Sequence, residues 1–225
     1  MSRLKSLIQK CTGGILGGTS ETPQFLILGL DKAGKTTLLY RLKLGHSSWP
    51  DEEIIKDMQD MRKPDETGEI IDPGYHYEEL GRPFSYGLWE VPGTDAMRHV
   101  WATFYHSIKI HGVIFVVAPN DSDDRVELAR KELHLLMNED ELRNACFCVI
   151  VNQQTSDGKK LYDEQEDELQ YRLGLNDLHG SCAWRTRKFV MDVLHLKSES
   201  DPQWIKMMEF CRTTLKDERG FNLQM

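Results

Sequence analysis

Continuous apolar runs alternate with amphipathic stretches along most of the chain. Such runs are typical of strands that are buried on both faces, whereas apolar positions at three- and four-residue spacing are typical of helices. Residues 75–91 instead alternate between apolar and polar positions on both sides of a Gly-Arg-Pro turn, which predicts a β-hairpin. The predicted strands cover residues 25–28, 112–119, 145–152 and 188–195, and the predicted helices cover residues 123–143, 164–175 and 201–217, with a further helix beginning near Lys35.

This order of elements predicts an α/β fold. Buried strands that alternate with helices form a mostly parallel sheet that carries helices on both faces. The chain has 225 residues, of which 40% are hydrophobic and 28% charged, and this is enough for one well-packed domain with extensions. We therefore expect a single domain.

Residues 1–20 differ from the rest of the chain. Leu4, Leu7, Ile8 and Ile15 recur at three- and four-residue spacing, which predicts a short amphipathic helix followed by a Gly-rich linker. We expect its apolar stripe to pack against the domain or a partner, and the alternative is a helix at a membrane surface. Residue 2 is Ser rather than Gly, which argues against N-myristoylation. Any membrane contact is therefore expected to be peripheral and weak.

Charge and cysteine content narrow the function classes. A formal net charge of −8 argues against general binding to nucleic acid or anionic membranes, since both need a basic surface. An odd number of cysteines, without CxxC spacing or a Cys/His cluster, indicates a reducing compartment and predicts no zinc site. We expect a cytoplasmic protein, with cytoskeletal, ciliary or membrane-surface association left open. The five cysteines are Cys11, Cys146, Cys148, Cys182 and Cys211.

The stretch GLDKAGKT, residues 29–36, carries the strongest functional signal. It matches the pattern GxxxxGK[ST] between a predicted strand and a predicted helix, which is the setting of a phosphate-binding loop. The backbone N–H groups would bind phosphate, Lys35 would reach the β- and γ-phosphates, and Thr36 would ligate Mg²⁺. The candidate nucleotide-binding residues here are Gly29, Leu30, Asp31, Lys32, Ala33, Gly34, Lys35, Thr36 and Thr37.

The sequence around this loop resembles a known family. The stretch GLDKAGKTTLLYRLKLG, Trp89, and the stretches GTDAMRHVW, GVIFVVAPND, RVELARKEL and NEDELRNA are similar to those of ADP-ribosylation-factor-like (Arf-like) small GTPases. The resemblance covers most of residues 23–178. It implies the P-loop small-GTPase fold over residues 21–225, with a six-stranded, mostly parallel sheet, and it implies GTP or GDP with Mg²⁺ as ligands.

The region that corresponds to switch I departs from the family pattern. The resemblance places Asp72 where a Thr completes the Mg²⁺ shell in the family, with Thr67 as an alternative. Residues 46–72 form an acidic insertion that is long relative to typical members. Loops of this length are usually functional or disordered. The insertion is interpreted as a partner-binding segment, and a solvated segment without a partner is the alternative.

A second departure lies at switch II. The family has Asp-x-x-Gly-Gln there, whereas this chain has Glu-Val-Pro-Gly-Thr at residues 90–94. The resemblance implies that Glu90 acts on Mg²⁺ through water and that the N–H of Gly93 meets the γ-phosphate. Pro92 lacks an N–H and restricts the backbone where the switch must move. Thr94 replaces the Gln that orients the attacking water, and it is too short for that role. Unaided hydrolysis is therefore expected to be very slow.

The third departure concerns base recognition. The family has Asn-Lys-x-Asp after this strand, where this chain keeps Asn152 but has Gln153 for the Lys and Thr155 for the Asp. Asn152 and Gln153 remain candidate nucleotide contacts, and Asp157 is an alternative carboxylate. A charged bidentate contact contributes about 1–3 kcal/mol of base discrimination, so guanine specificity is expected to be weak or absent. The last base-contacting loop is expected near residues 196–199.

These departures predict a pseudo-GTPase that binds GTP or GDP with little or no hydrolysis and acts as an interaction subunit of a larger assembly. The alternative is an active GTP-hydrolysing switch in membrane trafficking or ciliary transport, with a catalytic group supplied by a partner. A third hypothesis is an NTP-binding module with relaxed base preference. The candidate surfaces for protein partners are the hairpin 75–91, the insertion 46–72 and the N-terminal helix.

Overall fold

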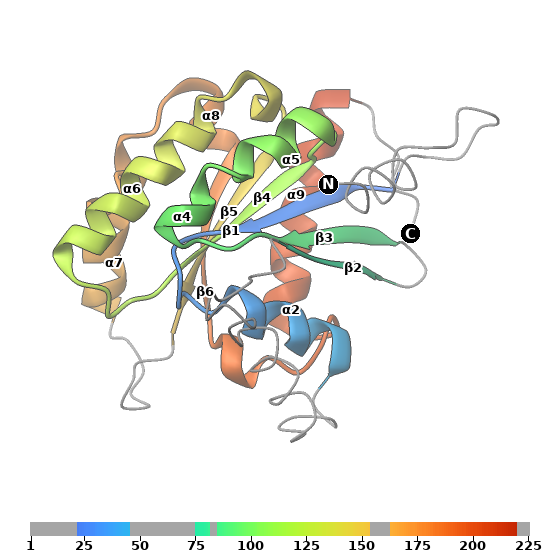
Figure 1. The fold of residues 1–225 in the computed structure, drawn as a ribbon, viewed down its shortest axis with the longest axis horizontal. Coiled ribbons are helices and arrows are strands. Elements are labelled where there is room, and N and C mark those ends of the chain that lie inside the picture. The colour runs from blue at the N-terminus through green and yellow to red at the C-terminus, as the bar shows by residue number, and fades with distance from the viewer. Residues whose placement is uncertain (1–21, 46–74, 82–84, 154–162, 220–225) are drawn as a thin grey trace, which may run out of the picture.

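Six strands form one central sheet in the computed structural model, which describes residues 22–45, 75–81, 85–153 and 163–219 (Figure 1). Their order is β2-β3-β1-β4-β5-β6. β2 is antiparallel to β3, and the other neighbouring strands are parallel. The predicted six-stranded, mostly parallel sheet is therefore confirmed. The strands are β1 (Gln24–Leu28), β2 (His76–Leu80), β3 (Tyr86–Glu90), β4 (Gly112–Val117), β5 (Cys146–Asn152) and β6 (Thr186–Met191).

Helices cover both faces of the sheet, as predicted (Figure 1). Alternate residues of a strand point to opposite faces, so Leu26 and Leu28 enter one buried cluster while Phe25 and Ile27 enter the other. One face carries α2 (Lys35–Leu44) and α9 (Pro202–Arg219), and the other carries α5 (Trp101–Ser107), α6 (Asp123–Met137), α7 (Asp163–Arg172) and α8 (Gly180–Arg185), with α4 (Asp95–Arg98) leading into α5.

The predicted hairpin is confirmed over β2 and β3, whereas residues 82–84 of its turn lie outside the described residues. Its register places Tyr77 opposite Trp89, and the two rings lie 4.3 Å apart between centroids. The indole N–H of Trp89 also donates to the Gln24 side-chain oxygen at 2.8 Å. The hairpin is therefore fixed to β1 through a buried aromatic residue, and this contact positions the end of β3.

Two predicted elements end at least four residues earlier than the sequence pattern indicated. The helix predicted over residues 123–143 ends at Met137, because the Asn138 amide donates to the carbonyl of His134 and its backbone N–H donates to Leu135. A separate 3₁₀ turn follows. The strand predicted over residues 188–195 ends at Met191, because the Asp192 side chain accepts the N–H of His195 and begins a 3₁₀ turn, η4 (Val193–His195).

Several predicted segments are not described, and several short helices were not predicted. The N-terminal helix of residues 1–20 and the insertion 46–72 lie outside the described residues. The short helices α4, α5 and α8 have four to seven residues, which is too few turns for a clear apolar period. Across the described ranges, no helix has both the length and the hydrophobicity that crossing a membrane requires.

Two leucines on α6 test the orientation of this helix against the sheet. Leu133 is fully buried, whereas Leu135 is 52% exposed. We expect Leu133→Ala to lower the free energy of unfolding by about 2–5 kcal/mol, because it removes buried methyl groups and leaves a cavity. Leu135→Ala is the matched control and should change it by less than about 0.5 kcal/mol. Urea unfolding of both variants measures the difference, and equal losses would contradict the described packing.

Candidate nucleotide-binding site

The phosphate loop connects β1 to α2 through three residues with positive φ: Gly29 at 132°, Lys32 at 63° and Gly34 at 104°. Glycine is needed at the first of these because a Cβ there would lie 2.2 Å from the carbonyl oxygen of Val116. Backbone conformations of this kind turn successive N–H groups toward one point. The local sequence thus produces a concave backbone at the end of the sheet.

The N-terminus of α2 opens onto this loop. The helix begins at Lys35 after the cap residue Gly34, which makes no side-chain capping bond, and the first turn contains no acidic residue. The first N–H groups of a helix have no partner within the helix and carry partial positive charge. This end of α2 is therefore suited to an anion such as phosphate.

The Lys35 side chain is held across the loop. Its ammonium group donates to the carbonyl oxygen of Leu30 at 2.8 Å, and the residue is only 5% exposed. A buried ammonium needs compensating oxygen atoms or negative charge. Lys35 therefore places a positive charge inside the loop; its contact with phosphate stays a prediction.

A buried carboxylate connects α2, β3 and β2 beside this lysine. Glu90 is 3% exposed, and its Oε1 atom accepts the hydroxyl of Thr36 at 3.0 Å. Its Oε2 atom lies 2.6 Å from Nδ1 of His76, which stands directly opposite in the hairpin register. His76 was not predicted as a site residue. Only the register of the hairpin brings it to Glu90.

These neighbours keep Glu90 ionised. Burial works to raise the pKa of Glu90, but the hydrogen bond with His76, the charge of Lys35 and the bond from Thr36 outweigh it, so the pKa lies below its usual value. The result is a negative charge next to the hydroxyl that the sequence predicts as a Mg²⁺ ligand. The negative charge of Glu90 and the hydroxyl oxygen of Thr36, both suited to a metal ion, therefore lie next to each other.

The residues present fit a hard cation. Mg²⁺ prefers oxygen ligands and usually takes one or two carboxylates together with water and phosphate oxygens. The Thr36 hydroxyl uses its proton in the bond to Glu90, which leaves its oxygen lone pairs available. Thr36 would bind the ion directly and Glu90 would hold its water ligands. Asp72 and Thr67, the candidates for a further ligand, lie outside the described residues.

The segment predicted as switch II packs directly on the phosphate loop. A Cβ at Gly93 would lie 1.9 Å from the carbonyl oxygen of Gly29, so only glycine allows this approach. The carbonyl of Pro92 accepts the Trp101 indole N–H at 2.8 Å, and the carbonyl of Gly93 accepts Arg98 at 3.2 Å. Side chains from α4 and α5 therefore also anchor this backbone.

Thr94, at the position of the catalytic glutamine, is exposed and serves as the N-cap position of α4. Its carbonyl oxygen accepts the N–H groups of Met97 and Arg98, whereas its side chain makes no capping bond. The residue therefore has a structural place at the start of a helix. Its short side chain carries one hydroxyl and no amide with which to orient a water molecule.

Arg125 on α6 clamps the phosphate loop from outside and was not predicted. Its guanidinium donates to the Asp31 carboxylate at 3.1 Å and to the Asp31 carbonyl at 2.7 Å. It also binds Asp121 at 2.7 Å. Burial works to raise the pKa of Asp31, but the bonds from Arg125 lower it overall. Asp31 is thus bound to the protein itself, which leaves the loop backbone to face a ligand.

Asn152 ties the base side of the site to the phosphate loop. Its amide N–H donates to the carbonyl of Ala33 at 3.2 Å, and its oxygen accepts the N–H of Val193 at 3.4 Å. A Cβ at Gly34 would lie 2.6 Å from the Asn152 amide nitrogen. Gln153 follows at the edge of the loop and donates its backbone N–H to Met191. Gln154, Thr155 and Asp157 lie outside the described residues.

The position expected for the last base-contacting loop stays a prediction. Leu196, the first residue of the predicted stretch 196–199, is buried in the core with α9. The segment that contacts Asn152 and lies near Gly34 is η4, through Val193. This segment comes before residues 196–199 in the chain.

The Glu90 charge gives this site a pH-dependent contribution to stability. A carboxyl whose pKa is lowered by folding stabilises the folded state above its unfolded value of 4.5, and this stabilisation is lost as pH falls through the folded pKa. We expect the free energy of unfolding to fall less steeply below pH 4.5 in Glu90→Gln than in the wild type. Glu79→Gln removes an exposed carboxylate from β2 and is the control. Chemical denaturation at several pH values measures the slopes, and parallel curves for wild type and Glu90→Gln would contradict this assignment.

Comparisons with known proteins agree with this fold. Among solved structures, the fold is similar to that of the Arl6 BBS3 small GTPase from Trypanosoma brucei, which was determined with the bound nucleotide analogue GppNp. The TM-score is 0.59 at 21% sequence identity, over 86% of this chain and 97% of that chain. The sequence model of the ADP-ribosylation factor family matches residues 13–197. This match spans most of the chain, which therefore belongs to the ADP-ribosylation factor family.

Proposed function

We propose that this Arf-family protein is a pseudo-GTPase, which binds GTP or GDP with Mg²⁺ at the phosphate loop and hydrolyses the nucleotide slowly or not at all. Members of the family generally bind guanine nucleotide with Mg²⁺. The phosphate and metal parts of the site support the binding half of the proposal, since Lys35, Thr36 and Glu90 lie together at the uncapped end of α2.

The observation that carries the proposal is the exposed Thr94 at the start of α4. Phosphoryl transfer demands little covalent chemistry from a protein, so catalysis depends on positioning the attacking group and stabilising charge. Thr94 lacks the amide that would orient water, and the backbone around it is anchored by Trp101 and Arg98. An intact phosphate loop next to this residue favours a protein that keeps its nucleotide bound over one that hydrolyses it.

The base side of the site supports a loosened preference for guanine. Asn152 uses both ends of its amide within the protein, so it orders the loop and leaves recognition to its neighbours. At the next positions the chain has Gln153 and Thr155 in place of Lys and Asp. Neither replacement carries the charge that a bidentate contact to guanine uses.

A protein without turnover acts through its surfaces, so we propose that it serves as an interaction subunit. The hairpin remains a candidate because, in the described part of the chain, β2 is the last strand of the sheet and an edge strand can pair with a partner. Its aromatic residues Tyr75 and Tyr77 pack inward on Trp89. Partner contact there would therefore rely on backbone pairing and on polar side chains.

An active switch that receives a catalytic group from a partner is the second candidate. The pairing of Thr36 with Glu90 favours it, because this metal half of the site is arranged as a working enzyme would need. The two functions differ in one respect that can be measured on the isolated protein. An active switch cycles between two nucleotide states, whereas a pseudo-GTPase keeps one.

Nucleotide extracted from the purified full chain tests the proposal. We expect about one nucleotide per chain, predominantly in the triphosphate form, with no conversion to the diphosphate over hours. Lys35→Ala should lose the nucleotide, because it removes the buried ammonium of the loop, whereas Lys43→Ala on the outer surface of α2 should keep it. Chromatography of the denatured protein identifies the nucleotide. Bound GDP that exchanges with added GTP would favour the active switch, and an empty wild-type site would overturn nucleotide binding.

Restoring the missing amide tests the role of Thr94. We expect Thr94→Gln to raise single-turnover GTP hydrolysis by roughly 10- to 100-fold, since correct positioning contributes on that scale. Thr94→Val keeps the shape of the side chain without its hydroxyl, and its rate should equal that of the wild type. Release of labelled phosphate measures both variants. A loss of turnover in Thr94→Val would show that the threonine hydroxyl itself takes part in catalysis.

A further inference from the structure

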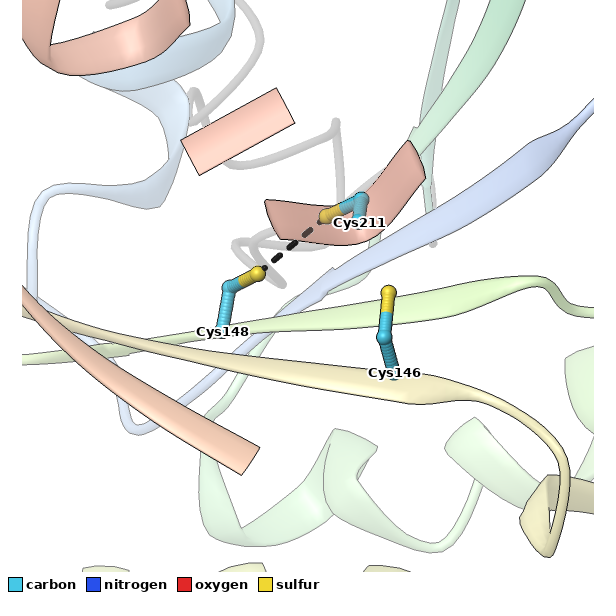
Figure 2. A group of neighbouring side chains, drawn as sticks. All are labelled: Cys146, Cys148 and Cys211. Atoms are coloured by element: carbon cyan, nitrogen blue, oxygen red, sulfur yellow. Dashed lines mark hydrogen bonds between the residues drawn. The ribbon is translucent and has the colours of Figure 1, made fainter. Parts of the chain in front are cut away.

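Three buried thiols lie together beneath α9, on the face of the sheet that carries α2 (Figure 2). Cys146 and Cys148 stand two residues apart on β5, so their side chains point to the same face. Cys211 comes from α9, 63 residues beyond Cys148. All three residues are at most 1% exposed. The spacing of the cysteines in the sequence predicted no such cluster, because the helix supplies the third thiol from a distant segment.

The sulfur atoms have the spacing of a set of metal ligands. All three lie within 4.8 Å of one another, and the sulfur atoms of Cys148 and Cys211 are 3.3 Å apart. Sulfur atoms that each lie about 2.3 Å from one ion are about 3.8–4.0 Å apart. Seating an ion therefore requires each sulfur separation to change by less than about 1 Å.

Two of the three sulfur atoms are already in direct contact. The sulfur atoms of Cys148 and Cys211 share a hydrogen bond, and Cys146 lies beside them on the same face of β5. The thiolate is the form of cysteine that binds metal. The cluster therefore presents three sulfur atoms that lie close enough together to share one ion.

The ligand number and surroundings select the ion. Within the described ranges, no fourth His, Cys, Asp or Glu joins the three sulfur atoms, whereas structural zinc sites take four protein ligands. The neighbours in the same buried cluster are apolar, among them Phe25, Ile114 and Trp204, so water is a poor fourth ligand here. Three soft sulfur ligands in an apolar setting suit Cu(I), which thiolates select and which accepts three-coordination.

A cavity of about 300 Å³ lies beside this cluster. Cys211 lines it together with the thioether residue Met208, and the carboxylates Glu199 and Glu209 lie along the same cavity. Carboxylates attract a cation, and a thioether is a soft ligand for Cu(I). An ion that enters the cavity therefore meets groups of the right charge and softness before it reaches Cys211.

We propose that Cys146, Cys148 and Cys211 form a binding site for one Cu(I) ion. Each Cu–S bond that forms with a thiol releases the thiol proton to solvent, and the oxidation state of copper does not change. The site joins β5 to α9, so a bound ion cross-links the sheet to the last helix. It lies at the opposite end of β5 from Asn152 and does not depend on the proposed nucleotide function.

Competition with a colorimetric chelator tests this site. The full chain carrying Cys11→Ala and Cys182→Ala keeps the three buried thiols and removes the other two. Under reducing, oxygen-free conditions it should take one Cu(I) per chain from bicinchoninate. Adding Cys146→Ala or Cys211→Ala should weaken binding by at least about 100-fold, because even the loss of a group that supports a metal ligand costs roughly 10- to 100-fold.

Two further measurements apply to the two-alanine protein alone, so the result does not depend on whether the ligand variants fold. Cu(I) should raise its melting temperature, since a ligand of the native state stabilises it. X-ray absorption should show three sulfur ligands at about 2.3 Å. No transfer from the chelator, nitrogen or oxygen ligands, preferential binding of Zn²⁺, or a Cys148–Cys211 disulfide that forms in place of metal binding would each overturn the proposal.

Discussion

The Glu90 carboxylate is almost completely removed from water, so neighbouring groups must compensate its charge. Thr36 on α2 and His76 on β2 bind its two oxygen atoms, and Lys35 adds positive charge. Removing one partner of a buried charge typically costs about 3–5 kcal/mol. The phosphate loop, the hairpin and the central sheet are therefore held in one arrangement by a single ionised group.

The same arrangement explains why the switch II backbone is so restricted. β3 ends at Glu90, and three residues later Gly93 meets the loop at a distance that only glycine allows. Trp101 and Arg98 bind the carbonyl groups of Pro92 and Gly93. Contacts with two neighbouring segments therefore restrict this backbone.

The sequence was sufficient for the parts of the site that are built from consecutive residues. Lys35 and Thr36 could be predicted because one short motif specifies both the loop and the start of α2. His76 and Arg125 could not, since each reaches the site from a distant element and neither belongs to a motif. The contact between His76 and Glu90 can be inferred only once the hairpin register is known. The last strand was predicted too long for a local reason, because its apolar pattern continues past Met191 into a 3₁₀ turn.

The contacts that shape the phosphate loop all come from the protein. Lys35 is bound by Leu30, Ala33 by Asn152 and Asp31 by Arg125. These contacts fix the shape of the loop, so a ligand has less ordering entropy to overcome there. The residues that shape the loop can therefore be retained in evolution while those at positions 94, 153 and 155 change. The domain stays folded through such changes. Its outer surfaces can then acquire new partners without an unstable intermediate.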